Sequence, residues 1–314
     1  MPIPARQLAL LEERSQHARA QRLRSESNSQ DRNALPNWID SVRRVPNIAL
    51  RSALFGAISK GHRPYAERLE IHAQSGISMR YTGVHLDQGD LDVWETVLHM
   101  ARAQELGAEC RVTAYRLLKE LGKTDTGKNR QILDRHLSRM KATGLEVRVG
   151  SCSYEGSLID EVYRDQATRA YVIRLNPKLK TLFEGDQFTE VDWSIRQALN
   201  GKPLAQWLHG FYASHARPFD MKVETLHRLC GSKATLLCDF KKDLRRALNA
   251  VAEASTSKGV PFSYETLGNK VYVKTTPSPS QRRHLARKLR TPAQGQSEKL
   301  LLNNKGRLIQ PTET

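Results

Sequence analysis

One succession of predicted elements occurs twice in this chain, and it constrains the fold more than any other feature. In the second half, apolar spacing predicts three helices, over 203–214, 223–229 and 236–254. Two strands follow over 261–265 and 270–275, and Gly268-Asn269 supplies the turn between them. A short helix, a tight turn, a longer helix and a hairpin are the plan of a winged helix.

The first half repeats this order of elements. It contains a predicted helix over 87–104, a short strand over 110–113, and helices over 114–121 and 128–143. Strand-like stretches follow over 146–151, 158–163 and 170–175, and we expect a hairpin among them. A separate hairpin, 68–72 with 77–81 around Gly76, precedes the first helix. The sequence therefore predicts an α+β protein with two tandem winged-helix domains.

Composition suggests the domain limits. Residues 15–37 are rich in Arg, Gln, Ser and Asn and nearly lack apolar side chains, which is typical of a flexible segment. The chain after Pro277 is polar and basic. We therefore predict a flexible arm, two winged-helix domains and a basic, largely disordered tail, over 1–34, 35–190, 191–277 and 278–314.

The charge of the chain indicates a polyanionic partner. Fifty Lys and Arg against 33 Asp and Glu give a formal net charge of +17. Such an excess repels itself in a folded protein, and phosphate neutralisation is its commonest use. No apolar stretch approaches the roughly 18 residues of a membrane span, and the N-terminus lacks a signal-peptide core. We expect a cytoplasmic protein that binds double-stranded DNA and no membrane.

The second helix of each winged helix is expected to enter the major groove. In the first domain its outer face carries Lys128, Arg130, Arg135, Ser138 and Arg139. In the second domain the face carries Lys241, Lys242, Arg245, Arg246 and Asn249, with Lys233 in the preceding turn. Any amphipathic helix has a charged outer face, but the second face is almost purely cationic, with Asp239 and Asp243 expected to its side.

Three contiguous strings resemble the TrfA-type plasmid replication initiators. They are Arg51-Ser52-Ala53-Leu54-Phe55-Gly56, Arg80-Tyr81-Thr82-Gly83, and the segment 86–95 that begins Leu86-Asp87-Gln88-Gly89-Asp90. The segment Leu226–Gly231 and the helix after it resemble the wider class of iteron-binding initiators. The resemblance implies a tandem winged-helix fold that binds repeated origin sites and helps to open the duplex. It also implies contacts with the host initiator, the replicative helicase and the sliding clamp, and control by a monomer–dimer equilibrium.

A short N-terminal motif is similar to the peptide that binds the bacterial sliding clamp. It reads Gln7-Leu8-Ala9-Leu10-Leu11, where Ala9 and Leu11 replace the Ser or Asp and the Phe of the usual pattern. In such peptides Gln meets a polar edge and the apolar residues fill a groove. We therefore predict that Gln7, Leu8, Leu10 and Leu11 bind the clamp; the start of a short amphipathic helix is the alternative.

Enzyme, metal and cofactor sites are not expected. Gly122-Lys123-Thr124 lacks the earlier glycine of a phosphate-binding loop, and Gly122 reads better as a helix C-cap. A rolling-circle nickase would need a His-x-His pair, and the histidines do not form one. The acids Asp87, Asp90, Asp92 and Glu95 are expected to cap a helix rather than bind metal.

The cysteines do not change this conclusion. Cys110, Cys152, Cys230 and Cys238 form no CxxC pair and are expected to be reduced and buried. His227, Cys230 and Cys238 lack a fourth ligand at zinc spacing. The sequence thus predicts a non-enzymatic, sequence-specific DNA-binding protein, and the resemblance implies that it initiates plasmid replication. A plasmid transcriptional repressor with the same two domains, which never opens DNA, remains the alternative.

Overall fold

A computed structural model describes residues 35–290, except positions 36, 59–60, 62, 75, 105, 150–151, 166 and 169. The predicted arm over 1–34, including the motif Gln7–Leu11, lies outside the described residues, as does the end of the tail over 291–314. None of the helices in the described part of the chain is long and apolar enough to span a membrane.

The first part of the chain combines a winged-helix-like set of elements with additional strands. Its helices are α2 (Asn47–Leu50), α3 (Gln88–Ala101), α4 (Ala114–Glu120), α5 (Gly127–Lys141) and the 3-10 helix η1 (Pro177–Asp186). Its strands are β1 (Val42–Pro46), β2 (Phe55–Gly56), β3 (Tyr65–Glu70), β4 (Ile77–Val84), β5 (Leu86–Asp87), β6 (Glu109–Thr113), β7 (Gly144–Val149), β8 (Cys152–Gly156), β9 (Glu161–Asp165), β10 (Ala170–Arg174) and β11 (Phe188–Asp192).

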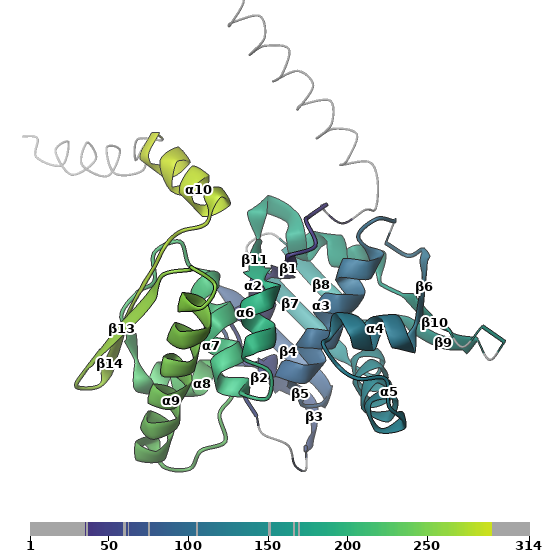
Figure 1. Cartoon of the computed structure of the whole chain (residues 1–314), viewed down its shortest axis with the longest axis horizontal. Helices are drawn as coiled ribbons and strands as arrows, with labels where there is room; N and C mark the ends of the chain where they lie inside the picture. Colours follow the sequence, from purple (N-terminus) through teal and green to yellow (C-terminus); the bar gives the residue numbers. More distant parts are fainter. Residues whose placement is uncertain are drawn as a thin grey trace, which may run out of the picture.

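The second part begins with a connecting helix, α6 (Trp193–Ala198). Then come α7 (Pro203–Ala213), β12 (Met221–Lys222), α8 (Val223–Leu229), α9 (Leu237–Thr256), β13 (Phe262–Leu267), β14 (Lys270–Thr275) and α10 (Pro279–Arg290). Both parts are α+β, and in Figure 1 the first is drawn in purple to teal and the second in green to yellow.

The two parts share one topology. In each, a helix is followed by a strand, two helices and a hairpin, and the first strand pairs with the last; in the first part β7 and β8 are inserted between the longer helix and the hairpin. The sheet orders are β6-β10-β9 and β12-β14-β13. We call the set α3, β6, α4, α5, β9, β10 the first unit, and the set α7, β12, α8, α9, β13, β14 the second unit.

The structure corrects one strand assignment. The sequence places 146–151 among the strands after α5 that supply the hairpin of the first unit. Instead, β7 pairs with β4 and β8 in a four-stranded sheet of order β3-β4-β7-β8. The hairpin of the first unit is β9-β10. The reason is burial: Leu145 and Val147 face the same core as Met79 and Tyr81 of β4, and pairing with β4 keeps all four inside.

Two hydrophobic clusters form the interior of the described chain. One runs from Leu35 to Val191 and the other from Ile195 to Val273. The two parts of the chain touch through backbone as well as side chains. Trp207 Nε1 donates to the Ser52 carbonyl at 3.1 Å, and Ala57 N–H donates to the Cys230 carbonyl at 2.7 Å. Cys110 and Cys230 are buried as expected, whereas Cys238 is exposed because it lies on the outer side of α9.

Local signals explain where the helices begin and end. Thr113 and Thr126 cap α4 and α5, each accepting a hydrogen bond from the backbone N–H three residues later. Gly122 ends α4 with a φ of 65°, so the predicted C-cap is confirmed. Gly231 does the same for α8 with a φ of 63°, and Ser232 N–H donates to the His227 carbonyl at 3.2 Å. These glycines let each short helix turn directly toward the longer one.

Replacing Gly231 by Ala should destabilise the fold by more than the strain of a left-handed backbone, which is about 1–2 kcal/mol. The added Cβ would lie 3.2 Å from Ala53 Cβ and 3.5 Å from Gly56 Cα, where the two parts of the chain meet. Gly259→Ala is the matched control, because its φ is +70° but no atom lies within 4 Å of the added Cβ. Chemical denaturation of both variants measures the difference, and equal decreases in unfolding free energy would contradict the close approach at Gly231.

Candidate nucleic-acid interface

We call α5 and α9, the longer helices that the sequence predicts to enter the major groove, the first and the second reading helix. Four of the five residues predicted on the outer face of the first lie on the exposed side of α5. Lys128, Arg130, Arg135 and Ser138 are exposed. Arg130 is already engaged, because its Nε and Nη2 donate to the two carboxylate oxygens of Asp125 at 2.6 and 2.7 Å. The remaining cations of this face are not paired in this way by any described residue.

Arg139 departs from the predicted exposed face. Its guanidinium turns inward to Asp90 at the start of α3, with Nη2 2.7 Å from Oδ1. The Asp90 side chain is 0% exposed, so water cannot solvate its carboxylate. The guanidinium of Arg139 compensates for the lost hydration of this buried charge. Spacing along α5 could not show this, because the partner lies 49 residues away in sequence.

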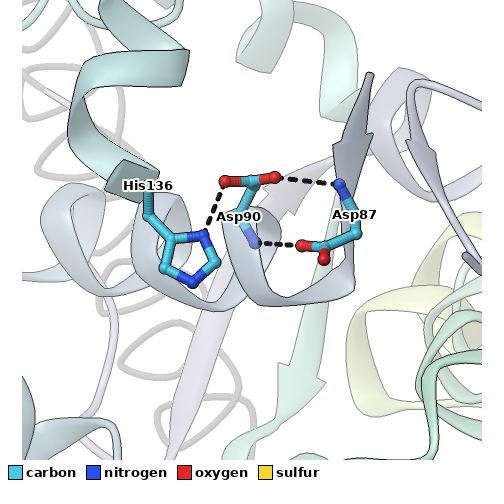
Figure 2. A group of neighbouring side chains, drawn as sticks. All are labelled: Asp87, Asp90 and His136. Carbon is cyan, nitrogen blue, oxygen red and sulfur yellow. Dashed lines mark hydrogen bonds and ion pairs between the residues drawn. The ribbon is translucent and has the colours of Figure 1, made fainter. Parts of the chain in front are cut away.

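Asp90 is the centre of a buried ionic cluster (Figure 2). Its Oδ1 lies 2.6 Å from His136 Nδ1, and its Oδ2 accepts from the Asp87 backbone N–H at 3.0 Å. Asp87 in turn accepts from the Asp90 N–H at 3.0 Å, which completes a reciprocal capping box. Arg63 adds a second guanidinium, with Nη1 3.0 Å from Asp90 Oδ2. The capping role predicted for Asp87 and Asp90 is confirmed.

Electrostatics keep this carboxylate ionised. Burial alone would raise the pKa of Asp90, but its hydrogen bond and charge interaction with His136, together with Arg139, lower the pKa to about 2. Asp87, Asp90 and His136 could also offer a metal three ligand atoms within 4.8 Å of one another. However, a metal would compete with the guanidinium groups of Arg63 and Arg139 for the same oxygens. The donor set therefore fits an ion-pair cluster better than a cation site.

Asp92 and Glu95 do not cap α3, contrary to expectation. They lie one and two turns further along the helix than its N-cap, and both meet Arg196 of α6. Arg196 Nε lies 2.6 Å from Asp92 Oδ1 and 3.4 Å from Glu95 Oε2. Burial raises the pKa of Glu95 to about 7, although the nearby Arg196 lowers it.

The second reading helix matches its predicted face more closely. Lys242, Arg245, Arg246 and Asn249 are exposed along α9, Lys241 is half-buried, and Lys233 is exposed in the preceding turn. The face is less purely cationic than predicted, because Asp239 lies 3.4 Å from Lys242 Nζ and Asp243 pairs with Arg246. Both pairs are largely exposed to solvent, where ion pairs are weak and easily exchanged.

The hairpins supply residues that the sequence did not single out. In the second unit, Tyr264 of β13 donates its hydroxyl hydrogen to Asn249 Oδ1 at 2.5 Å, which joins hairpin and reading helix. In the first unit, Arg164 of β9 and Tyr171 of β10 both contact Asp134 of α5. Asp134 is thereby neutralised, and its negative charge on the reading helix is offset. Only the fold reveals these contacts, since no local pattern links the hairpin to the helix.

Two units that each present a basic helix before a hairpin are an arrangement widely used to contact duplex DNA. Residues 4–260 match the family model described as TrfA protein, and the chain therefore belongs to this family. A relative from Escherichia coli, plasmid replication initiator protein TrfA, is 28% identical over 221 residues. That match covers 67% of this chain and 56% of the relative, so the chain spans little more than half the relative's length.

Two solved structures are also similar. They are described as crystal structures of RctB domains 2 and 3, and they are 12% and 14% identical to this chain with TM-scores of 0.46 and 0.45. The matches cover 69% and 73% of this chain and 91% and 97% of those chains.

Asp90→Asn should destabilise the first unit, because the buried anion between two guanidinium groups is removed. Removing one partner of a buried ion pair destabilises a protein by about 3–5 kcal/mol. Here we expect the unfolding free energy to fall by about 2–3 kcal/mol, because Arg63 and Arg139 can turn toward solvent. Asp125→Asn is the control, since it removes an exposed pair and should leave the unfolding free energy nearly unchanged. Urea denaturation compares the two, and equal effects would contradict a structural role for the cluster.

The pH dependence of stability provides a second test of Asp90. Its pKa is 3.8 when unperturbed and about 2 in the folded chain, so the unfolded state binds the proton more readily. The stabilisation is therefore complete above pH 3.8 and disappears as the pH falls toward 2. Other carboxyl groups with lowered pKa values, such as Asp125 and Asp165, also contribute to the loss of stability in acid. Acid titrations of folding should therefore show a larger decrease in the wild type than in Asp90→Asn, and identical curves would be the contrary result.

Proposed function

We propose that this chain is a sequence-specific DNA-binding initiator of plasmid replication, built on two tandem winged helices. The observation that carries the proposal is the repeated topology, in which each unit presents the outer face of its longer helix before a hairpin. Membership of the TrfA family supports the replication role. In this function the chain binds repeated origin sites in the cytoplasm and helps to open the duplex, and it uses no catalytic residue or cofactor.

The second unit is proposed as the stronger DNA reader. Lys242, Arg245, Arg246 and Asn249 form a row at helical spacing, and the first three carry exposed positive charge. DNA phosphates can replace Asp239 and Asp243 as partners, because exposed ion pairs cost little to break. Tyr264 orients Asn249, whose amide can then read a base edge.

The first unit is proposed to contribute fewer direct contacts. Arg139 is committed to Asp90, and Arg130 is paired with Asp125. Lys128, Arg135 and Ser138 remain as the exposed candidates on α5. Release of Arg130 from its exposed partner would add one phosphate contact. We therefore expect the first unit to supply register on the DNA more than base readout.

A pocket at the edge of the second unit fits the phosphate backbone. Its volume is about 620 Å³, and it is lined by Lys222, Glu224, Thr225, Arg228, Leu267, Asn269 and Lys270. The three cations come from β12, α8 and β14, so they surround one opening from different elements. We propose that this pocket lies beside the DNA when α9 occupies the groove.

Partners other than DNA belong to the same proposal. Gln7, Leu8, Leu10 and Leu11 would bind the sliding clamp, and the resemblance to initiators implies contacts with the host initiator, the helicase and a second copy of the chain. A transcriptional repressor with the same units is the second candidate function. Direct repeats beside an A·T-rich stretch would favour the initiator, and a single promoter site would favour the repressor.

Arg245→Ala with Arg246→Ala should weaken binding to a duplex selected by the wild-type chain from a random pool by at least about tenfold. The plot of log affinity against log salt should also flatten by about 0.9 for each phosphate that the variant no longer neutralises. Arg68→Ala with Arg80→Ala is the control, because both side chains are exposed on the four-stranded sheet and the charge change is equal. Equally weakened binding by the two double variants would show that only net charge matters.

Leu10→Ala with Leu11→Ala should abolish capture of purified bacterial sliding clamp while DNA affinity stays unchanged. The reason is that the two leucines would fill the apolar groove of the clamp. Surface plasmon resonance on immobilised clamp measures the effect, with Ala9→Ser as the control that moves the motif toward the usual pattern. Equal clamp binding by the wild type and the leucine variant would reject the motif.

A further inference from the structure

The two units are joined by a buried charge. Arg196 lies in α6, the helix that follows the last strand of the first part, and its side chain is 1% exposed. Its guanidinium binds two carboxylates of α3, Asp92 at 2.6 Å and Glu95 at 3.4 Å. Its Nη2 also donates to the carbonyl and the side-chain oxygen of Gln88 at 3.3 and 3.2 Å. The N-terminal half of α3 is therefore held by one side chain.

The second unit reaches the same site through α7. Gln206 Nε2 donates to Asp92 Oδ2 at 3.0 Å, and the Gln206 carbonyl accepts from Arg196 Nη1 at 3.4 Å. One guanidinium and one carboxylate thus connect three helices, α3, α6 and α7. His209, one turn further along α7, is also buried, and burial lowers its pKa to about 4 so that it stays neutral beside Arg196.

The ion pairs and hydrogen bonds of this network fix the relative orientation of the three helices more strictly than apolar contacts would. Apolar surfaces can slide over one another at small cost, whereas buried charges must keep their partners at hydrogen-bond distance. The network is also incompletely satisfied, because neither oxygen of Glu95 has a hydrogen-bond partner among the described residues. A junction selected for stability alone would do better with well-packed apolar side chains. Its chemistry instead fits a role in fixing geometry.

The network at Arg196 lies between the two reading helices. On one side, α3 packs against α5 and holds Arg139 and His136 through Asp90. On the other side, α7 packs against α9. In Figure 1, α3, α6 and α7 occupy the centre of the molecule between α5 and α9. Any rotation at Arg196 would therefore change the placement of one reading helix relative to the other.

We infer that Arg196 is a positioning residue that sets the spacing between the two half-sites that the chain accepts on DNA. The inference rests on the proposed function. Adding one base pair between two half-sites moves them apart by about 3.4 Å and rotates them by about 35°. A rigid junction cannot follow both changes, so a chain with Arg196 in place should bind one spacing strongly and its neighbours weakly.

The test uses duplexes in which the spacing is varied. The wild-type full chain first selects a duplex from a random-sequence pool, and footprinting locates its two half-sites. Base pairs are then added or removed between them, one at a time. Affinities of the wild type and of Arg196→Met are measured on each duplex by fluorescence anisotropy. Arg44→Met is the matched control, because Arg44 pairs with Glu190 across β1 and β11 and does not link the units.

We expect the affinity of the wild type and of Arg44→Met to fall about tenfold or more when the spacing changes by one base pair. For Arg196→Met, the affinities at spacings that differ by one base pair should differ by less than about threefold, although the variant still binds each half-site. Arg196→Met leaves the buried Glu95 and the partly buried Asp92 without their guanidinium partner, so its folding is checked by thermal unfolding. If it does not fold, the triple variant Arg196→Met, Asp92→Asn, Glu95→Gln takes its place, because it also removes the unpaired carboxylates. Arg196→Lys is a second variant, which keeps the positive charge and loses the planar guanidinium.

The outcomes separate the inference from the function on which it rests. A folded Arg196 variant that keeps the wild-type spacing preference would overturn the inference and leave the proposed function intact. A uniform decrease in affinity at every spacing would also overturn it, because that is the result of a merely structural role. If the wild type selects no duplex at all, the proposed function itself fails.

Discussion

The arrangement of this molecule depends on charges buried along one helix, α3. Asp90, near its start, holds Arg139 and His136 of α5, while Asp92 and Glu95 hold Arg196 of α6. Positions 90 and 92 point to different sides of a helix, so one element serves two junctions. Each junction buries ions whose partners come from distant parts of the chain. Helix α3 therefore ties the first reading helix to its own unit and both units to each other.

The basic side chains of this chain thus fall into two groups with different physics. Arg139 and Arg196 are withdrawn from solvent, and their charge is matched by buried carboxylates. Arg245 and Arg246 are exposed on α9, where pairing is weak and exchangeable. Only the second group can contribute much to counterion release on DNA. The number of basic residues therefore overstates the cationic surface, because some of the arginines hold the fold together.

Much of the fold could be predicted from the sequence. Apolar periodicity and glycine stops located α4, α5, α8 and α9 to within a few residues, because each depends on local signals such as Thr126 and Gly231. The short strands β1, β2, β5 and β11 were not predicted, since two to five residues without a period give no signal and their pairing is set by tertiary contacts. The assignment of β7 was wrong for the same reason, because its partner β4 lies far away in sequence.

The candidate site was predictable where it depends on helical spacing and not where it depends on tertiary contacts. The exposed row on α9 follows from the 3.6-residue period of a helix. The inward turn of Arg139, the neutralisation of Asp134 and the junction at Arg196 each require a partner from another element. The segments that resemble TrfA-type initiators include residues of that junction, Gln88, Asp92 and Glu95.

In the proposed function, two units of one chain read adjacent stretches of duplex DNA. Hydroxyl-radical footprinting of the wild-type chain on the duplex it selects shows whether both units contact the DNA. We expect two protected patches on one face of the DNA, separated by about one helical turn of 10–10.5 base pairs, within a site of about 20 base pairs. A single patch no longer than one turn would show that only one unit reads the DNA.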